Sequence, residues 1–213
     1  RMSDCRSLGN SPDDEEQILN DMGLIRADAV APTLQEAIQY PSLNIRGMSS
    51  GWVGKEARTI VPATATAEID IRLVKESDYL YLLDLVRSRL AELGYHVIDH
   101  EPSDDERLKF ANLVTFEYNF WYDAYRSDMN AAAGQMARSG MRHLYGQEPI
   151  LIRTSGGSVP ISPFVETLGV PAAKVPTVNI DNNQHSPNEN IRLGSFVEGI
   201  AILMSVLSQT PGD

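Results

Sequence analysis

The sequence predicts a mixed α/β (α+β) protein with a small layer of antiparallel strands that carries a helix on one face. Three observations lead to this fold class. Polar and apolar residues alternate over residues 64–73, apolar residues recur at helical spacing in residues 77–94 and 128–145, and short apolar segments precede two polar loops in the last third of the chain. Alternation is typical of a strand with one face in water, whereas spacing by three or four residues indicates a helix packed on one side. Together they favour an α+β layer followed by a second α/β part.

Composition and charge exclude several classes of partner. The chain has 213 residues, enough for one large domain or two small ones, and 42% of them are hydrophobic. Its net charge is −11 and its pI is near 4.8, which argues against nucleic acid and anionic membranes because both attract basic surfaces. No apolar run is long enough to span a bilayer. The single cysteine, Cys5, excludes an internal disulfide, and this fits a reducing, cytoplasmic location.

Changes in pattern suggest the domain boundaries. We expect residues 1–42 to form an amino-terminal extension, with one short helix that begins at the acidic run 13–16 because acidic side chains favour a helix start. Residues 43–115 form the antiparallel layer, and residues 116–213 form the second part. Dense charge between residues 102 and 117, followed by clustered aromatic residues, marks the boundary between the two parts.

Within the antiparallel layer we expect two strands, a helix and a third strand. The first strand begins at Leu43, and the second covers residues 64–73, half-buried through one apolar face. Ser77 is the predicted cap of the helix, Gly94 ends it, and residues 95–99 form the third strand. The strands are expected to form a sheet with one face exposed to solvent, and the helix packs on the other face.

The second part contains two predicted helices and two short buried strands. A helix over residues 128–145 is followed by strands at residues 150–152 and 172–178, each of which leads into a polar loop. Ser195 and Glu198 have the spacing of a capping box for the last helix. Its predicted buried face consists of Phe196, Ile200, Leu203 and Leu207.

The two polar loops are the candidate site. The first, residues 153–161, contains the glycine pair Gly156-Gly157, which lets the backbone approach a ligand closely. The second, residues 182–189, contains His185 among small residues, with Glu189 close enough in sequence to orient its imidazole. Histidines that bind metals commonly need such an acceptor. In a functional site, the reactive groups commonly lie on loops that are supported by strands packed behind them.

These loops resemble the M20 family of cocatalytic zinc peptidases, the carnosinase-like and aminoacylase-like dipeptidases. Gly156-Gly157-Ser158-Val159-Pro160 matches the family's GGS-[IV]-P motif, and His185-Ser186-Pro187-Asn188-Glu189 matches its His-Ser-x-Asn-Glu motif. Residues 40–47, 57–62 and 69–74 resemble the family's lid, or dimerisation, domain. Each motif is moderately specific, but their order and spacing over residues 40–208 make the resemblance strong.

The resemblance implies a hydrolase that cleaves an amide bond in a dipeptide or an N-acyl amino acid with a water activated by two divalent ions. The ions are expected to be zinc, with manganese or cobalt as alternatives. Among the family's metal ligands only the last histidine maps here, onto His185, with Glu189 as its acceptor. The early His-x-Asp motif, the Glu-Glu base motif and the bridging aspartate have no counterpart. The sequence therefore resembles the lid and the carboxyl-terminal portion of such an enzyme, and we expect this chain alone to lack a catalytic base and to be inactive.

The resemblance also implies which residues meet the substrate. They are Thr59, Arg72, Arg153, Gly157 and Ser158. In the family, lid residues of one subunit reach the substrate held by its partner, which implies a homodimer through the lid. The planar fork of an arginine suits a peptide carboxylate. The pattern alone favours a solvated strand residue for Arg72 and leaves Ser158 balanced between a substrate contact and a loop-capping hydroxyl. Thr154-Ser155 stands where the family has a single acidic residue.

Two other functions compete with this interpretation. A serine hydrolase could use Ser158 and His185, but the chain lacks a Gly-x-Ser-x-Gly elbow, and Pro160 would obstruct the helix that should follow. A non-catalytic dimerisation module is the second alternative. The missing ligands favour it, whereas the two intact loops favour descent from a working site.

Overall fold

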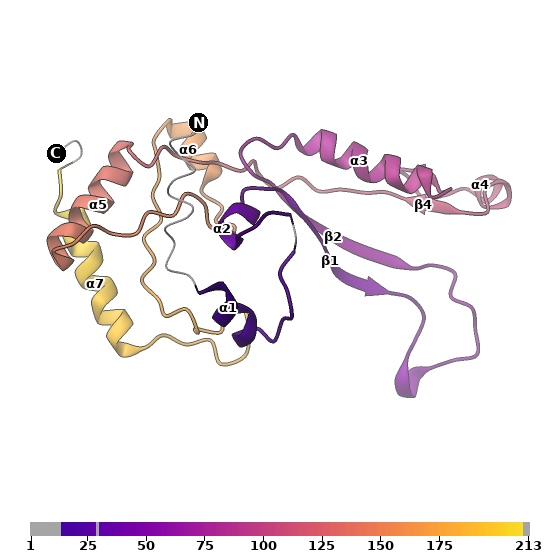
Figure 1. Cartoon of the computed structure of the whole chain (residues 1–213). Coiled ribbons are helices and arrows are strands. Elements are labelled where there is room, and N and C mark those ends of the chain that lie inside the picture. Colours follow the sequence, from indigo (N-terminus) through magenta and orange to yellow (C-terminus); the bar gives the residue numbers. More distant parts are fainter. Residues whose placement is uncertain (1–13, 29, 211–213) are drawn as a thin grey trace. The chain divides into compact units, whose positions relative to one another are not determined.

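The computed structural model describes residues 14–28 and 30–210, so Cys5 lies outside the described residues. Figure 1 shows the helices and strands of the chain, which divides into two compact units. One unit is Tyr40–Ala124, and the other combines Arg1–Gln39 with Tyr125–Asp213. The mixture of helices and short strands confirms the predicted α/β class. The domain boundaries that we expect after residues 42 and 115 remain a prediction.

The unit Tyr40–Ala124 begins with a two-stranded antiparallel ribbon, as predicted. Strand β1 (Ser42–Ser49) pairs with β2 (Thr66–Arg72), and the register shifts between Ile45 and Gly47. The burial expected for one face of the strand over residues 64–73 is found only towards its end, where Ile71 and Leu73 are half-buried, whereas Ile69 is 41% exposed. The ribbon has no third strand hydrogen-bonded to it within the described residues, so most of its apolar side chains stay at the surface.

Helix α3 (Tyr79–Glu92) follows β2 and packs against β3. Its predicted cap is wrong by one residue. The carboxylate of Asp78 accepts hydrogen bonds from the backbone N–H groups of Leu80 and Tyr81, at 2.9 and 3.3 Å. Ser77 instead accepts from the N–H of Val74 and closes the preceding turn. Both residue types can cap a helix, and here the longer reach of the aspartate satisfies two free N–H groups at once.

A second, parallel pair of strands completes this unit. The predicted third strand is confirmed as β3 (His96–Ile98), but it pairs with β4 (Leu113–Thr115) rather than joining the first ribbon. Strand β4 was not predicted, because three residues are too few for alternation to stand out. Ile98, 8% exposed, is the buried apolar residue of the unit. The short helix η3 (Gly54–Glu56) lies between β1 and β2.

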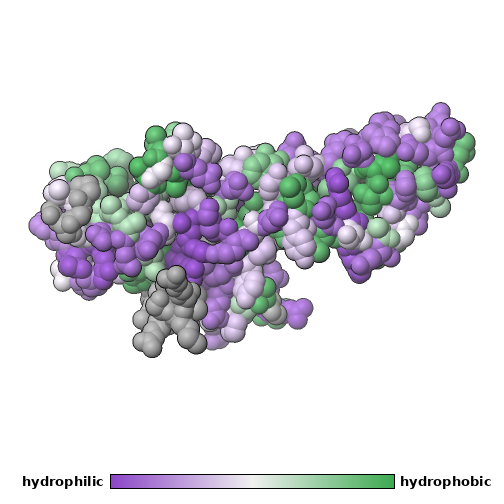
Figure 2. Space-filling model, turned by 90° about the horizontal axis from the view of Figure 1, so that it is seen from above, coloured by the Kyte–Doolittle hydropathy of each residue, from purple (hydrophilic) through white to green (hydrophobic). Residues whose placement is uncertain are grey.

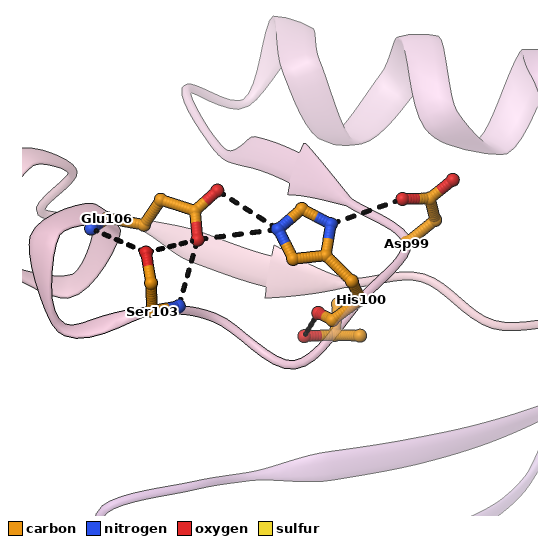
Figure 3. A network of polar contacts seen from close by, with 5 residues as sticks. Asp99, His100, Ser103 and Glu106 are labelled. Carbon is orange, nitrogen blue, oxygen red and sulfur yellow. Dashed lines mark hydrogen bonds and ion pairs between the residues drawn. The ribbon is translucent and has the colours of Figure 1, made fainter.

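Helix α4 (Asp104–Lys109) begins with a polar network that includes His100 (Figure 3). Ser103 and Glu106 form a capping box. The imidazole of His100 lies between two carboxylates, with Nδ1 3.3 Å from Asp99 Oδ1 and Nε2 3.1 Å from Glu106 Oε1. These contacts, first with Asp99 and then with Glu106, raise the pKa of His100 above 6.5. Hydrogen bonds from the backbone and side chain of Ser103 lower the pKa of Glu106 to about 2.

The network predicts a pH window for its own contribution to stability. Because the pKa of His100 is raised in the folded state, its contribution is present below 6.5 and is lost as the pH rises through the raised value. The pKa of Glu106 is lowered from 4.5, so its contribution is present above 4.5 and is lost as the pH falls towards 2. We therefore expect the network to be strongest between these two limits, and an NMR titration of His100 should give a midpoint above 6.5.

Two carboxylate variants test this prediction. Asp99→Asn should move the His100 midpoint down, because the bond to Asp99 is the largest cause of the raised pKa. Glu92→Gln is the matched control, since Glu92 pairs with Arg89 and not with His100. A His100 midpoint that is the same in wild type and Asp99→Asn would contradict the arrangement in Figure 3.

The other unit is built mainly of helices. In chain order they are α1 (Glu15–Asp21), α2 (Leu34–Ala37), α5 (Ala132–Tyr145), α6 (Ser162–Leu168) and α7 (Leu193–Leu207). The short helix expected after the acidic run is confirmed, and so is the helix that ends at Gly146, although α5 begins at Ala132 and not at residue 128. Helices α5 and α7 pack closely at Gly140, whose backbone carbonyl accepts a 2.8 Å hydrogen bond from the hydroxyl of Ser205. Among the described residues of both units, no helix is long and apolar enough to cross a membrane.

Three predictions for this unit are wrong. Residues 150–152 and 172–178 are not strands, and Ile152 and Val178 are exposed. A strand needs a neighbour that accepts and donates its backbone hydrogen bonds, and the sheets within the described residues contain only β1 to β4. Ser195 does not cap α7, which begins at Leu193 with Arg192 as its flanking residue.

The buried face of α7 is also different from the predicted one. Gly199, Ile202 and Ser205 are buried, whereas Phe196 is 54% exposed and the other predicted core residues are exposed as well. Ser205 lies where α5 and α7 approach closely and bonds to the carbonyl of Gly140, whereas Gly199 lies against Thr177, where an added Cβ would come within 2.9 Å of the threonine Cβ. Figure 2 shows hydrophobic side chains at the surface of both units.

Candidate functional site

The first predicted loop follows residues 150–152 and leads into α6. Arg153 is half-buried, whereas Gly157 and Ser158 are exposed. Close to Arg153, the hydroxyl of Thr154 donates a 3.4 Å hydrogen bond to the side-chain oxygen of Gln39. The loop therefore presents its glycines and Ser158 to solvent while its first residues are held against the segment after α2.

The second predicted loop, residues 182–189, has a strained backbone. Three residues other than glycine have positive φ: Asn183 at 54°, His185 at 64° and Asn188 at 64°. Such conformations cost free energy for residues with a Cβ and persist only when the surroundings fix them. Here the loop is closed by a 2.9 Å hydrogen bond from the N–H of Asn190 to the carbonyl of Asn182. The side chains of the loop, His185 included, are mostly exposed, so packing does not hold it.

Four residues at the base of this loop form what we call the loop neck: Asn179, Asp181, Asn190 and Arg192. Asn179 is 8% exposed. Its amide Nδ2 donates to Asp181 Oδ1 at 2.9 Å and lies 3.5 Å from Asn190 Oδ1, and its Oδ1 accepts from the N–H of Arg192 at 3.0 Å. An ion pair of 2.5 Å joins Arg192 Nη2 to Asp181 Oδ2. The amide of Asn179, with a smaller effect from Arg192, lowers the pKa of Asp181.

Sequence reasoning identified the loop and missed its neck. Asn179 comes directly after the apolar segment 172–178 and before the predicted loop, and none of the matched motifs includes it. The available signal was Asn179-x-Asp181 on one side and Asn190-x-Arg192 on the other, because short amides and carboxylates that flank a loop commonly bond to its backbone.

His185 is the only member of the expected metal set in this loop, and the donor set does not complete a site. Among the described residues, no group of three or more histidine, cysteine, aspartate or glutamate side chains is placed to hold a metal ion. A zinc site needs at least three protein ligands, so the described part of this chain does not fit a metal by itself. No hydrogen bond joins His185 to Glu189, which leaves the orienting role of Glu189 as a prediction.

The lid residues expected to bind substrate lie in the unit Tyr40–Ala124. Thr59 is exposed in the segment between η3 and β2, next to Arg58, whose guanidinium lies 4.8 Å from the centre of the Trp52 ring. Arg72 ends β2, and its Nε donates a 2.5 Å hydrogen bond to Asp70 Oδ2 on the same face of the strand. The structure therefore groups Arg153, Gly157 and Ser158 in one loop and Thr59 with Arg72 in the other unit.

Comparisons with known proteins agree on one family. Residues 7–97 match the model of the M20 peptidase dimerisation domain. The Cys-Gly metallodipeptidase of Schizosaccharomyces pombe is 24% identical over 178 residues, which is 83% of this chain and 35% of that protein. The human Beta-Ala-His dipeptidase is 24% identical over 173 residues, or 81% of this chain and 32% of that protein. The chain thus spans about a third of the length of these relatives.

A solved structure supports the same fold. The di-peptidase Dug1p from Saccharomyces cerevisiae matches with a TM-score of 0.73 and 23% identity, over 97% of this chain and 41% of that one. At this identity the likeness concerns the fold. It extends over both units, although the match to the dimerisation domain ends at residue 97.

Proposed function

We propose that this chain belongs to the M20 peptidase family and supplies the lid and the carboxyl-terminal part of a metal-dependent dipeptidase. The observation that carries the proposal is the order of lid segment, GGS loop and His185 loop along one chain whose relatives are dipeptidases. The amide bond of a dipeptide or an N-acyl amino acid is the proposed substrate. Cys-Gly and β-Ala-His are the first candidates, because the relatives are named for them.

The proposed contribution of this chain is recognition. Arg72 and Arg153 are candidates to bind the carboxylate of a peptide, since a guanidinium donates to both oxygens of a carboxylate. Thr59, Gly157 and Ser158 would contact the rest of the substrate. His185 would supply one ligand to a metal, zinc in the first instance or else manganese or cobalt. The described residues do not complete the ligand set, so the remaining ligands and the base must come from outside them.

We also propose a homodimer through the lid, located in the cytoplasm. The match to a dimerisation domain supports self-association. So does the exposed surface of the unit Tyr40–Ala124, where β1 and β2 each have one edge without a hydrogen-bonded strand and Leu80 and Tyr81 of α3 are exposed. Sedimentation should show a dimer at micromolar concentration. A single monomer species at high micromolar concentration would contradict this part of the proposal.

Hydrolysis of Cys-Gly and β-Ala-His by the natural protein tests the proposed activity. We expect turnover that a chelator abolishes and that added zinc or manganese restores, while serine-directed reagents have no effect. His185→Ala should abolish turnover, and His143→Ala, at an exposed position near the end of α5, should not. Inhibition by a serine reagent would favour the serine hydrolase with Ser158 and His185. A stable dimer without turnover under any metal would favour the non-catalytic dimerisation module.

A further inference from the structure

The loop neck contains one buried side chain that bonds to both sides of the His185 loop. The amide of Asn179 reaches Asp181 before the loop, and it reaches Asn190 and the backbone of Arg192 after it. Asn179 is 8% exposed, whereas the residues between 183 and 189 are exposed. One buried amide therefore joins the two ends of a solvent-exposed loop.

The backbone of this loop needs such a connection. His185 has φ at 64°, a conformation that is unfavourable for histidine and that a free loop would leave. Within the loop, the N–H of Gln184 bonds to the side chain of Asn182, and the N–H of Ser186 bonds to the carbonyl of Asn183. These turns fix the tip only as long as the two ends stay together, because exposed hydrogen bonds alone open readily.

We propose that Asn179 is a positioning residue that fixes the backbone conformation in which His185 is presented. The inference deepens the proposed function, on which the use of His185 rests. Asparagine suits the position because its side chain donates and accepts at the same time. It donates to the carboxylate of Asp181 and accepts from the N–H of Arg192. Aspartate keeps the shape but cannot donate when ionised, and it would lie beside the carboxylate of Asp181.

A charge-neutral exchange of the two side chains provides a direct test. In Asn179→Asp the bond to Asp181 is lost and two carboxylates face each other. In the double variant Asn179→Asp/Asp181→Asn the bond can form in the opposite direction, and the new aspartate can still accept from the N–H of Arg192. The net charge of the double variant equals that of the wild type. The exchange also removes the ion pair between Asp181 and Arg192, so the single variant Asp181→Asn is measured beside it to report that loss separately.

The measurements follow the loop itself and need no metal. The backbone chemical shifts of His185 report its positive φ, and hydrogen exchange at the N–H of Asn190 reports closure of the loop ends. We expect Asn179→Asp to shift the His185 signals towards those of an unstructured chain and to speed exchange at Asn190 by about tenfold, the effect of losing one hydrogen bond. The double variant should restore both. Ser205→Ala is the control, because it removes a buried hydrogen bond between α5 and α7 without touching the loop.

The outcomes separate this inference from the proposed function. Unchanged His185 signals and Asn190 exchange in Asn179→Asp would overturn the inference, as would a double variant that stays as perturbed as the single one. The same perturbation of the loop in Ser205→Ala would also overturn it, because loss of overall stability would then explain the effect. If His185→Ala leaves dipeptide hydrolysis unchanged, the proposed function fails, whereas the signals of His185 still decide whether Asn179 fixes the loop.

Discussion

Arg72→Ala is expected to lower kcat/KM for a dipeptide by roughly thirty-fold to a thousand-fold in the natural protein, the loss of about 2–4 kcal/mol of charge-assisted contact to the substrate carboxylate. The same change should alter the free energy of unfolding by less than about 0.5 kcal/mol, as ordinary surface substitutions do. The Arg72 side chain is 48% exposed, and it pairs with Asp70, which lies two residues away on the same strand. An exposed pair of this kind contributes little to stability.

Arg46→Ala is the matched control for Arg72→Ala. Arg46 lies on β1 of the same ribbon, and its guanidinium pairs with Glu68 at 3.1 Å in an exposed ion pair. Both changes remove one positive charge and one exposed pair, but only Arg72 is among the proposed substrate contacts. Equal losses of kcat/KM in the two variants would show a general effect of charge, and the specific role of Arg72 would be refuted.

A mixing experiment tests whether Arg72 acts on the partner subunit. Arg72→Ala homodimers and His185→Ala homodimers are each expected to be inactive. In a mixed dimer, a lid that acts in trans brings the intact Arg72 of one subunit to the subunit that keeps His185, and one active site is restored. Recovered turnover on mixing supports the shared site. Proven heterodimers without turnover would rule it out.

Local chemistry explains why some elements could be predicted from the sequence. The strand at β2 and the helices α3 and α5 carry regular patterns over seven to fourteen residues, and their ends are marked by residues such as Gly94 and Gly146 with positive φ. Glycine takes this conformation without strain, so its place in the sequence is informative. The two polar loops were found for a similar reason, because their motifs are contiguous.

Pairing between distant segments explains most of the errors. Residues 150–152 are apolar enough for a buried strand, but a strand also requires a partner whose position no local pattern reveals. The face of α7 was misjudged because large apolar residues usually lie inside, whereas here Gly199 and Ser205 do. Asn179 was missed because its three bonds connect residues up to 13 apart in sequence, and only the folded loop brings them together.

Gly140→Ala is expected to destabilise the protein by about 1–3 kcal/mol, the usual cost of overpacking a tight contact. In most helices the same substitution stabilises, because alanine loses less backbone entropy than glycine. At Gly140 an added Cβ would lie 2.5 Å from the Cα and 2.7 Å from the nitrogen of Val206. These are backbone atoms of α7, so relief requires the two helices to move apart. That movement would also stretch the hydrogen bond from Ser205 to the carbonyl of Gly140.

Gly194→Ala separates this steric effect from helix propensity. Gly194 lies in the first turn of α7, and an added Cβ there would meet nothing within 4 Å. We expect a gain of a few tenths of a kcal/mol, up to about 0.5, because only the propensity term operates. Urea unfolding of both variants measures the difference, and opposite signs for the two substitutions are the predicted result. A Gly140→Ala variant as stable as Gly194→Ala would refute the close contact between Gly140 of α5 and the backbone of Val206 in α7. The small residues on the buried face of α7 would then not be what holds the two helices together.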